Sequence, residues 1–257
     1  MNNTKIPVYL SLTSIYNNQN RLLLTLQSVL SQTLIPDKVF IYLSEFPSFF
    51  DNGFENKQIT NTNLLNLINN NHIINIKWGK DIGPFGKLLP LLEDKWNEDC
   101  IIITIDDDTI YSNNLIENLV HDYYNYKCVI NYRSFTPSFN HIDNFDYHKR
   151  KDLEKLSLYN FPTGKGGILY KPEFFKKTNN LIFDQNIYLN TCSKQDDIWF
   201  YIIRILNNIP CYTDNKKWHT KDITSNGLYF NYNSKNNENT KAFKKTIEKL
   251  KDLNYKL

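Results

Sequence analysis

The sequence predicts an α/β fold with a mainly parallel central sheet, and three observations support this prediction. Short apolar runs alternate with helical patterns through the first third of the chain, and strands separated by helices form βαβ units with parallel strands. One run, residues 100–105 (CIIITI), is apolar without alternation, as expected of a strand buried on both faces. The 257 residues are 41% hydrophobic and 22% charged, which allows a sizeable core and excludes disorder over most of the length.

The expected elements of the first half follow one another as strand and helix. Residues 6–12 are apolar, β-branched and aromatic, which predicts the first strand. Residues 21–34 carry apolar side chains at helical spacing, and Pro36 ends that helix. The further strands expected in this half are residues 38–43, 73–78 and 100–105, and the further helices are residues 64–68 and 88–96.

The second half is less regular. A helix is expected over residues 114–124 and a strand over 127–132. Residues 134–158 are polar and aromatic without a clean period, which indicates either a functional loop or elements that the pattern does not reveal. Its aromatic side chains would either stack on sugars or pack in the core; they include Phe135, Phe139, Phe145 and Tyr147. A glycine cluster at 164–167 leads into a short strand at 168–170, and a strong helix follows at 196–206.

We expect a single domain, because the chain shows no linker, repeat or composition break. Its two lobes would cover about residues 1–110 and 111–237. A C-terminal amphipathic helix is expected over 238–253, where Phe243, Ile247 and Leu250 share one face amid lysines. Such a helix either docks on the protein or contacts a membrane surface, and both alternatives stay open.

Composition excludes several classes of protein. A net charge of +3 is too small to indicate a nucleic-acid partner. No apolar run approaches the ~20 residues that cross a bilayer, and the first residues lack a signal-peptide pattern. The four cysteines lie far apart, against a zinc knuckle or disulfide framework. We therefore expect a soluble cytoplasmic protein, with peripheral membrane contact through the C-terminal basic helix as the open alternative.

The strongest chemical signal is Asp106-Asp107-Asp108, directly after the buried strand. Ligands of open α/β sheets bind outside the carboxyl ends of the strands. Adjacent carboxylates repel one another, which favours a cation beside them. Alternation along an extended segment brings Asp106 and Asp108 together and turns Asp107 away. Such ligands suit Mg²⁺ or Mn²⁺ shared with phosphate oxygens; the alternative is a solvated acidic turn that caps the next helix.

The stretch TIDDDTIY resembles the D-x-D motif of GT-A fold glycosyltransferases, in particular family 2-like enzymes. The likeness extends over about residues 6–219. The first strand, helix and second strand are similar to the first βαβ unit of these enzymes, and residues 81–90 (DIGPFGKLLP) resemble a donor-side segment. The resemblance implies the GT-A fold, which is Rossmann-like and shared by nucleotide-diphospho-sugar transferases. It also implies an Mg²⁺ or Mn²⁺ cofactor, a nucleotide-diphosphate sugar such as a UDP-sugar as donor, and a hydroxyl acceptor.

The resemblance also implies roles for particular residues. Gln195-Asp196-Asp197 resembles the Glu-Asp pair of inverting members, although Gln195 or Asp196 stands where Glu is usual. It implies Asp197 as general base and Asp196 as the residue that orients the acceptor or the helix; a helix cap is the alternative. His219 follows in the order of a third metal ligand beside Asp106 and Asp108. The remaining expected contacts are Ser11, Thr13, Arg21, Asp81, Lys87, Asp106 and Asp107 with the donor, and Gly166, Gly167 and Trp199 with the acceptor.

The sequence therefore predicts an inverting, metal-dependent glycosyltransferase of the hexosyltransferase class. A sugar-phosphate nucleotidyltransferase is the first alternative, but such enzymes carry a Gly-rich loop after the first strand, and residues 11–20 contain no Gly. A metal-dependent phosphohydrolase is disfavoured because the other histidines do not cluster with carboxylates. A carbohydrate-binding protein of the same fold without catalytic activity is the third alternative.

Overall fold

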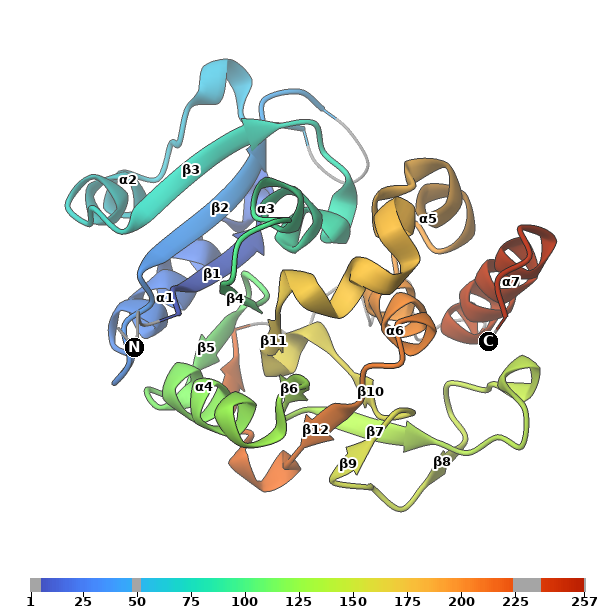
Figure 1. Cartoon of the computed structure of the whole chain (residues 1–257). Coiled ribbons are helices and arrows are strands. Elements are labelled where there is room, and N and C mark those ends of the chain that lie inside the picture. The colour runs from blue at the N-terminus through green and yellow to red at the C-terminus, as the bar shows by residue number, and fades with distance from the viewer. Residues whose placement is uncertain (1–5, 48–51, 224–236, 257) are drawn as a thin grey trace.

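A computed structural model describes residues 6–47, 52–223 and 237–256. Its largest feature is an eight-stranded sheet in the order β3-β2-β1-β4-β11-β6-β12-β9. In Figure 1, α3 passes in front of this sheet and α1 passes behind it. The sheet strands are β1 (Val8–Thr13), β2 (Lys38–Ser44), β3 (Ile74–Gly79), β4 (Ile101–Thr104), β6 (Val129–Asn131), β9 (Leu156–Ser157), β11 (Ile168–Tyr170) and β12 (Cys211–Thr213).

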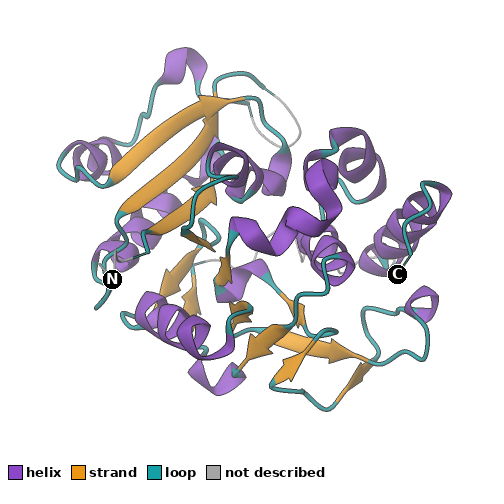
Figure 2. Cartoon of the chain, viewed as in Figure 1, coloured by secondary structure: helices purple, strands orange, loops and turns teal. Residues whose placement is uncertain are grey.

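The helices alternate with strands in the first half and dominate the end of the chain (Figure 2). Between β3 and α3 lies the 3₁₀ segment η3 (Gly83–Lys87), and before β11 lies η5 (Gly164–Gly166). The α-helices are α1 (Gln19–Leu30), α2 (Thr62–Asn69), α3 (Leu89–Asp94), α4 (Leu115–Tyr126), α5 (Gln185–Thr191), α6 (Asp196–Leu206) and α7 (Glu238–Asp252).

Strand direction in the sheet determines where the functional segments meet. β1 pairs in parallel with β2 and β4, and β2 pairs in parallel with β3, so these four strands end at one edge. β11 runs antiparallel to β4, with Ile168 opposite Thr104. The residues before β11 therefore lie at the same edge as the residues after β4. This confirms a mainly parallel sheet whose second half is mixed.

α1 ends at Leu30, earlier than its apolar pattern indicates. The N–H of Thr33 donates to the carbonyl of Asn113 (2.6 Å). The side chain of Gln32 donates to the carbonyl of Ser112 (2.6 Å). These tertiary contacts draw residues 31–34 out of the helix and toward the segment that follows β5 (Thr109–Tyr111).

Residues 134–158 contain short strands that the sequence pattern did not reveal. β7 (Ser134–Pro137) pairs with β8 (Arg150–Lys151) and with β10 (Phe161–Pro162), all antiparallel. Strands of two to four residues are too short to show a period. The aromatic side chains pack on one another: Phe135 stacks on Phe161 at 4.9 Å between ring centroids. Of the two roles predicted for these aromatic side chains, packing in the core is the one observed.

α7 is docked on the protein. Its apolar face is buried, with Phe243 and Leu250 fully covered and Ile247 nearly so. The Phe243 ring stacks on Phe145, with ring centroids 3.8 Å apart. A membrane cannot contact that apolar face in this arrangement. Among the residues that the structure describes, no helix combines the length and apolarity needed to pass through a bilayer.

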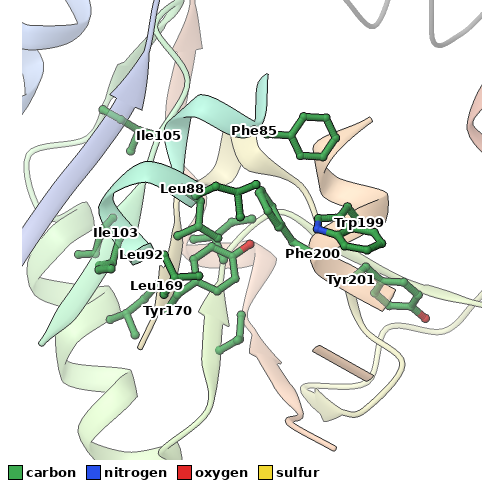
Figure 3. Close-up of a cluster of buried hydrophobic side chains, with 14 of the residues drawn as sticks. Phe85, Leu88, Leu92, Ile103, Ile105, Leu169, Tyr170, Trp199, Phe200 and Tyr201 are labelled. Atoms are coloured by element: carbon green, nitrogen blue, oxygen red, sulfur yellow. The ribbon is translucent and has the colours of Figure 1, made fainter. Parts of the chain in front are cut away.

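One hydrophobic cluster lies below the carboxyl edge of the sheet and joins η3, α3, β4, β11 and α6 (Figure 3). Phe85 from η3 contacts Phe200 from α6, with ring centroids 6.0 Å apart. Tyr170 from β11 approaches the same Phe200 ring at 6.2 Å. Ile103 of β4 is fully buried in this cluster. The cluster fixes η3, β4, β11 and α6 relative to one another. Each of these elements has, at or beside one of its ends, a residue that lies at the edge of the sheet.

Candidate active site

Four polar side chains and one glycine, from four distant segments, meet at this edge. Asp106 follows β4, Lys87 ends η3, and Asp196 and Asp197 open α6. The Lys87 ammonium lies 2.6 Å from Asp106 Oδ1 and 3.2 Å from Asp196 Oδ2. Gly164 donates its backbone N–H to Asp197 Oδ1 (3.0 Å). We call Lys87, Asp106, Asp196, Asp197 and Gly164 the carboxylate cluster.

Apolar neighbours in the sequence fix each member of the carboxylate cluster. Lys87 lies between the buried Phe85 and Leu88, and Asp106 directly follows the buried Ile105. After Asp197 the chain continues into Ile198, which is also buried. Because these apolar side chains are anchored below the edge, the polar side chains beside them are presented at the edge in defined positions.

The charges of the carboxylate cluster perturb one another. Burial opposes the charged form of Lys87, but the carboxylates of Asp106, Asp196 and Asp197 outweigh it and raise its pKa well above the usual value. Burial raises the pKa of Asp196, and Lys87 opposes this rise. Burial, followed by the charge of Asp196, raises the pKa of Asp197 to about 8. A carboxylate of raised pKa is a stronger base, as general-base chemistry requires.

Asp107 points away from the carboxylate cluster. Its Oδ2 accepts hydrogen bonds from Ser14 Oγ (2.5 Å) and Asn18 Nδ2 (3.0 Å). Burial raises the pKa of Asp107 to about 6. These hydrogen bonds hold the connection between β1 and α1 in place. Asp107 Oδ2 therefore has structural partners, and the donor contact expected of this residue stays a prediction.

Asp108 faces the other basic side chains of the edge. Thr109 Oγ1 donates to its Oδ1 (3.3 Å). Burial, followed by the charge of Asp106, raises the pKa of Asp108, while Lys165 and Arg21 oppose this rise. A carboxylate whose pKa is raised by a neighbouring carboxylate is stabilised in its charged form by a nearby cation. The donor set of Asp106 and Asp108, hard carboxylate oxygens, fits Mg²⁺ or Mn²⁺.

His219 lies away from Asp108 along a two-stranded ribbon. β13 (Thr220–Asp222) pairs with β5 so that Thr220 faces Tyr111, and Ser112 N–H donates to the His219 carbonyl (3.1 Å). The backbone carbonyl of Asp108 instead accepts from the N–H of Ile223 (3.1 Å). Four residues of extended chain separate the two positions, about 13 Å.

The ribbon register therefore gives no support to His219 as a metal ligand. His219 is also exposed. Within residues 6–47, 52–223 and 237–256, no group of three or more His, Cys, Asp or Glu side chains is placed to hold a metal ion. Asp106 and Asp108 remain the predicted protein ligands of a metal ion.

Three residues expected to contact the donor are either buried or hydrogen-bonded within the protein. Ser11 is fully buried within β1 between β2 and β4. Thr13 Oγ1 donates to the carbonyl of Tyr42 (2.9 Å). Asp81 Oδ1 accepts from the N–H of Gly83 (2.7 Å) and so shapes the entry to η3. Burial excludes Ser11 from donor contact, and the side-chain oxygens of Thr13 and Asp81 support the edge.

The three residues expected to contact the acceptor instead pack within the protein. Trp199 is 0% exposed, and its indole N–H donates to the carbonyl of Ile182 (2.9 Å), so it belongs to the core. Gly166 packs against Arg133, where a Cβ atom would lie 2.5 Å from the arginine Cβ. Gly167 has φ +70°, a conformation that favours glycine, and packs on Leu115. Gly164, in the same glycine cluster, is the residue that faces the carboxylates.

Comparison with known proteins gives likeness in structure alone: no family model and no curated protein matches the sequence. The structure of S. aureus TarS residues 1–349 in complex with UDP-GlcNAc matches with TM-score 0.54 and 12% identity, over 89% of this chain and 61% of that one. The complex of the same TarS fragment with UDP matches with TM-score 0.52 and 12% identity, over 84% of this chain and 60% of that one. The structure of 4-diphosphocytidyl-2C-methyl-D-erythritol synthase from Anaerococcus prevotii DSM 20548 matches with TM-score 0.52 and 10% identity, over 88% of this chain and 94% of that one.

These likenesses establish the fold. The chain has the nucleotide-diphospho-sugar transferase fold, which confirms the GT-A type of fold expected from the D-x-D stretch and the first βαβ unit. The chain spans about three fifths of the length of the TarS chains it matches.

Proposed function

We propose that the protein is a metal-dependent glycosyltransferase that moves a sugar from a nucleotide-diphosphate sugar to a hydroxyl group of a glycan or other acceptor, with inversion at the anomeric carbon. The observation that carries the proposal is the carboxylate cluster, in which Asp106 at the end of β4 and Asp197 at the start of α6 meet beside Lys87. The matched TarS structures hold UDP and UDP-GlcNAc, so UDP-sugars are the donors to test first.

Asp106 and Asp108 are the residues that would hold Mg²⁺ or Mn²⁺. Such an ion, when bound, neutralises the diphosphate of the leaving group. The positive charge of Arg21 and of Lys165 acts on Asp108. We assign these two side chains to the diphosphate side of the site, because they add positive charge beside the acids.

Asp197 acts as the general base. Its Oδ1 is held by the N–H of Gly164, and its Oδ2 takes the proton from the acceptor hydroxyl. The acceptor oxygen forms a bond to the anomeric carbon while the bond from that carbon to the diphosphate oxygen breaks. The nucleoside diphosphate leaves with the bonding electrons, and attack from the opposite face inverts the anomeric centre.

A nucleotidyltransferase is the second candidate, because the Anaerococcus synthase matches over 94% of its own length. The connection after β1 argues against it. That connection contains no glycine and is ordered instead by Asp107 through Ser14 and Asn18. Asp196 and Asp197 also have a clear use in removing a proton from a hydroxyl acceptor.

The deciding experiment compares the products of two reactions in Mn²⁺. The protein is incubated with a panel of UDP- and GDP-sugars, alone and with hydroxyl acceptors, and release of nucleoside diphosphate is measured. In parallel it receives nucleoside triphosphates with sugar phosphates, and pyrophosphate is measured. Nucleoside diphosphate release supports the proposal. Pyrophosphate release identifies a nucleotidyltransferase, and tight donor binding without either product identifies a binding protein.

A further inference from the structure

Lys87 differs from the diphosphate ligand that the sequence suggests. Its side chain is 9% exposed, and its ammonium lies between Asp106 and Asp196 at 2.6 and 3.2 Å. Asp106 follows a strand of the donor half of the site, whereas Asp196 begins the helix that carries the proposed base. One buried cation thus contacts carboxylates from both halves.

Gly164 closes the space around this cation. A Cβ atom on Gly164 would lie 2.8 Å from Lys87 Nζ, 3.1 Å from Asp106 Oδ1 and 3.4 Å from Asp197 Oδ1. The glycine is buried, and its N–H is bonded to Asp197. The backbone of η5 therefore packs directly on the ammonium group, and a phosphate oxygen would need to displace either this backbone or a carboxylate to reach it.

We propose that Lys87 is a positioning residue, which ties the donor carboxylate Asp106 to the acceptor carboxylate Asp196 and does not bind the diphosphate. The proposal rests on the glycosyltransferase function proposed above. Its second part is that Gly164 is required at its position because only a residue without a side chain leaves room for Lys87 between the two carboxylates.

The physical reason is the balance of charge. Asp106, Asp196 and Asp197 converge, and Lys87 is the cation that contacts the first two of them. Without it the carboxylates repel one another, and α6 loses its link to the end of β4. A shift of about 1 Å between the base and the donor costs on the order of 10²-fold in rate. Donor affinity should change much less, because Asp106 itself is retained and the other groups assigned to the donor side, Asp108, Arg21 and Lys165, lie outside this link.

The first test is Lys87→Met, which keeps an unbranched side chain only one atom shorter and removes the charge. The expected result is a kcat lowered about 10²-fold, with the dissociation constant for UDP in Mn²⁺ within about threefold of the wild type. Lys171→Met is the matched control. Lys171 is equally buried, with a side chain 4% exposed and ion pairs to Asp99 (2.5 Å) and Glu173 (3.3 Å), but it lies at the opposite edge of the sheet. Its replacement should leave kcat unchanged.

Gly164→Ala is the second variant and replaces none of the charged residues. It forces the ammonium or Asp106 to move, so it should reproduce the kcat loss of Lys87→Met with donor affinity again preserved. This variant decides the question if Lys87→Met does not fold, as judged by its melting temperature.

Two outcomes would overturn the inference. UDP affinity that falls tenfold or more in Lys87→Met, with unchanged kcat at saturating donor, would make Lys87 a diphosphate ligand. Full kcat in Lys87→Met and Gly164→Ala would reduce the link to a structural contact. Failure of the proposed function is recognised separately, because then the wild type itself releases no nucleoside diphosphate from any nucleotide sugar.

Discussion

The two ends of β4 each hold a buried lysine between two acidic residues, yet their surroundings differ. At the amino end, Lys171 pairs with Asp99 and Glu173, whose side chains are 69% and 61% exposed. At the carboxyl end, Lys87 pairs with Asp106 and with Asp196, whose side chains are 29% and 9% exposed. Water therefore solvates the acids at the amino end, whereas the protein covers most of the acids at the carboxyl end.

The difference separates a structural ion pair from a binding site. Exposed acids beside Lys171 cost little, and their pairs contribute little to stability. Enclosed acids in excess of their cation are costly unless another positive group binds. Asp197, which is near Lys87, and Asp108, which is near Asp106, both have raised pKa values. Excess buried negative charge at only one end of β4 is what a site for a cation and a proton requires.

The largest expected effect contrasts the two ends directly. Asp108→Ala should remove Mn²⁺-dependent UDP binding, because it deletes one of two proposed metal ligands, while the melting temperature stays near that of the wild type. Asp99→Ala, at the amino end, should leave UDP affinity unchanged. Calorimetric titration of UDP with and without Mn²⁺ measures both variants. Equal affinities in Asp108→Ala and wild type would rule out the metal site at the carboxyl end.

The next effect concerns the base. Asp197→Asn keeps the shape of the side chain and an oxygen that can accept from Gly164, so α6 should remain intact. Transfer should fall by at least about 10²-fold, the usual contribution of a general base, with near-normal donor affinity. Initial rates at saturating donor and acceptor measure this. Full transfer activity would move the assignment to Asp196, and loss of folding would reveal a structural cap.

The pH dependence follows from the same carboxylate. Because the pKa of Asp197 is raised to about 8, about a tenth of it is ionised at pH 7. The rate of transfer should therefore rise about tenfold between pH 7 and 9 and then level off. This rise should be absent in Asp197→Asn; an equal rise in the variant would assign the titration to another group.

Stability should change with pH in the opposite sense. The ordinary pKa of an Asp is about 4, so between pH 4 and 8 the folded state binds more protons at Asp197 than the unfolded state does. The contribution of this group to the free energy of unfolding therefore falls as pH rises. Melting temperatures of Asp197→Asn should exceed those of the wild type increasingly from pH 5 to pH 8.

The smallest expected effect distinguishes the β5–β13 ribbon from the end of β4. His219 lies at the far end of the ribbon from Asp108, so His219→Ala should change Mn²⁺-dependent UDP affinity by less than about twofold, since exposed substitutions outside a site have small effects. The same titration that measures Asp108→Ala checks it. A loss as large as that of Asp108→Ala would restore His219 as the third ligand.

Local sequence patterns predicted the long elements of this fold well. The helix expected over 196–206 coincides with α6, because two acidic residues open a strongly apolar periodic run. The β5–β13 ribbon was missed, since each strand has three residues. Its pairing joins segments about a hundred residues apart, a contact that single-sequence patterns do not encode.

The sequence pointed to the acidic residues of the candidate site but not to the contacts that they make. Adjacent acids after a buried strand and at the start of a helix are visible in the sequence at Asp106 and Asp197. The link through Lys87 and Gly164 depends on the antiparallel placement of β11 beside β4, which no local pattern shows. Trp199 was misassigned for a related reason: its place in the sequence did not reveal that α6 is buried on all sides from Ile198 to Ile205.

The position of β11 also governs how the protein must fold. β11 lies between β4 and β6 in the sheet but follows both in the chain. β6 and β12 therefore cannot join the parallel strands until residues 168–170 have been synthesised and inserted. Contacts this distant in sequence form slowly. We expect the carboxylate cluster, which spans residues 87–197, to appear only in the final folding phase, so recovery of activity should lag behind recovery of helical structure during refolding.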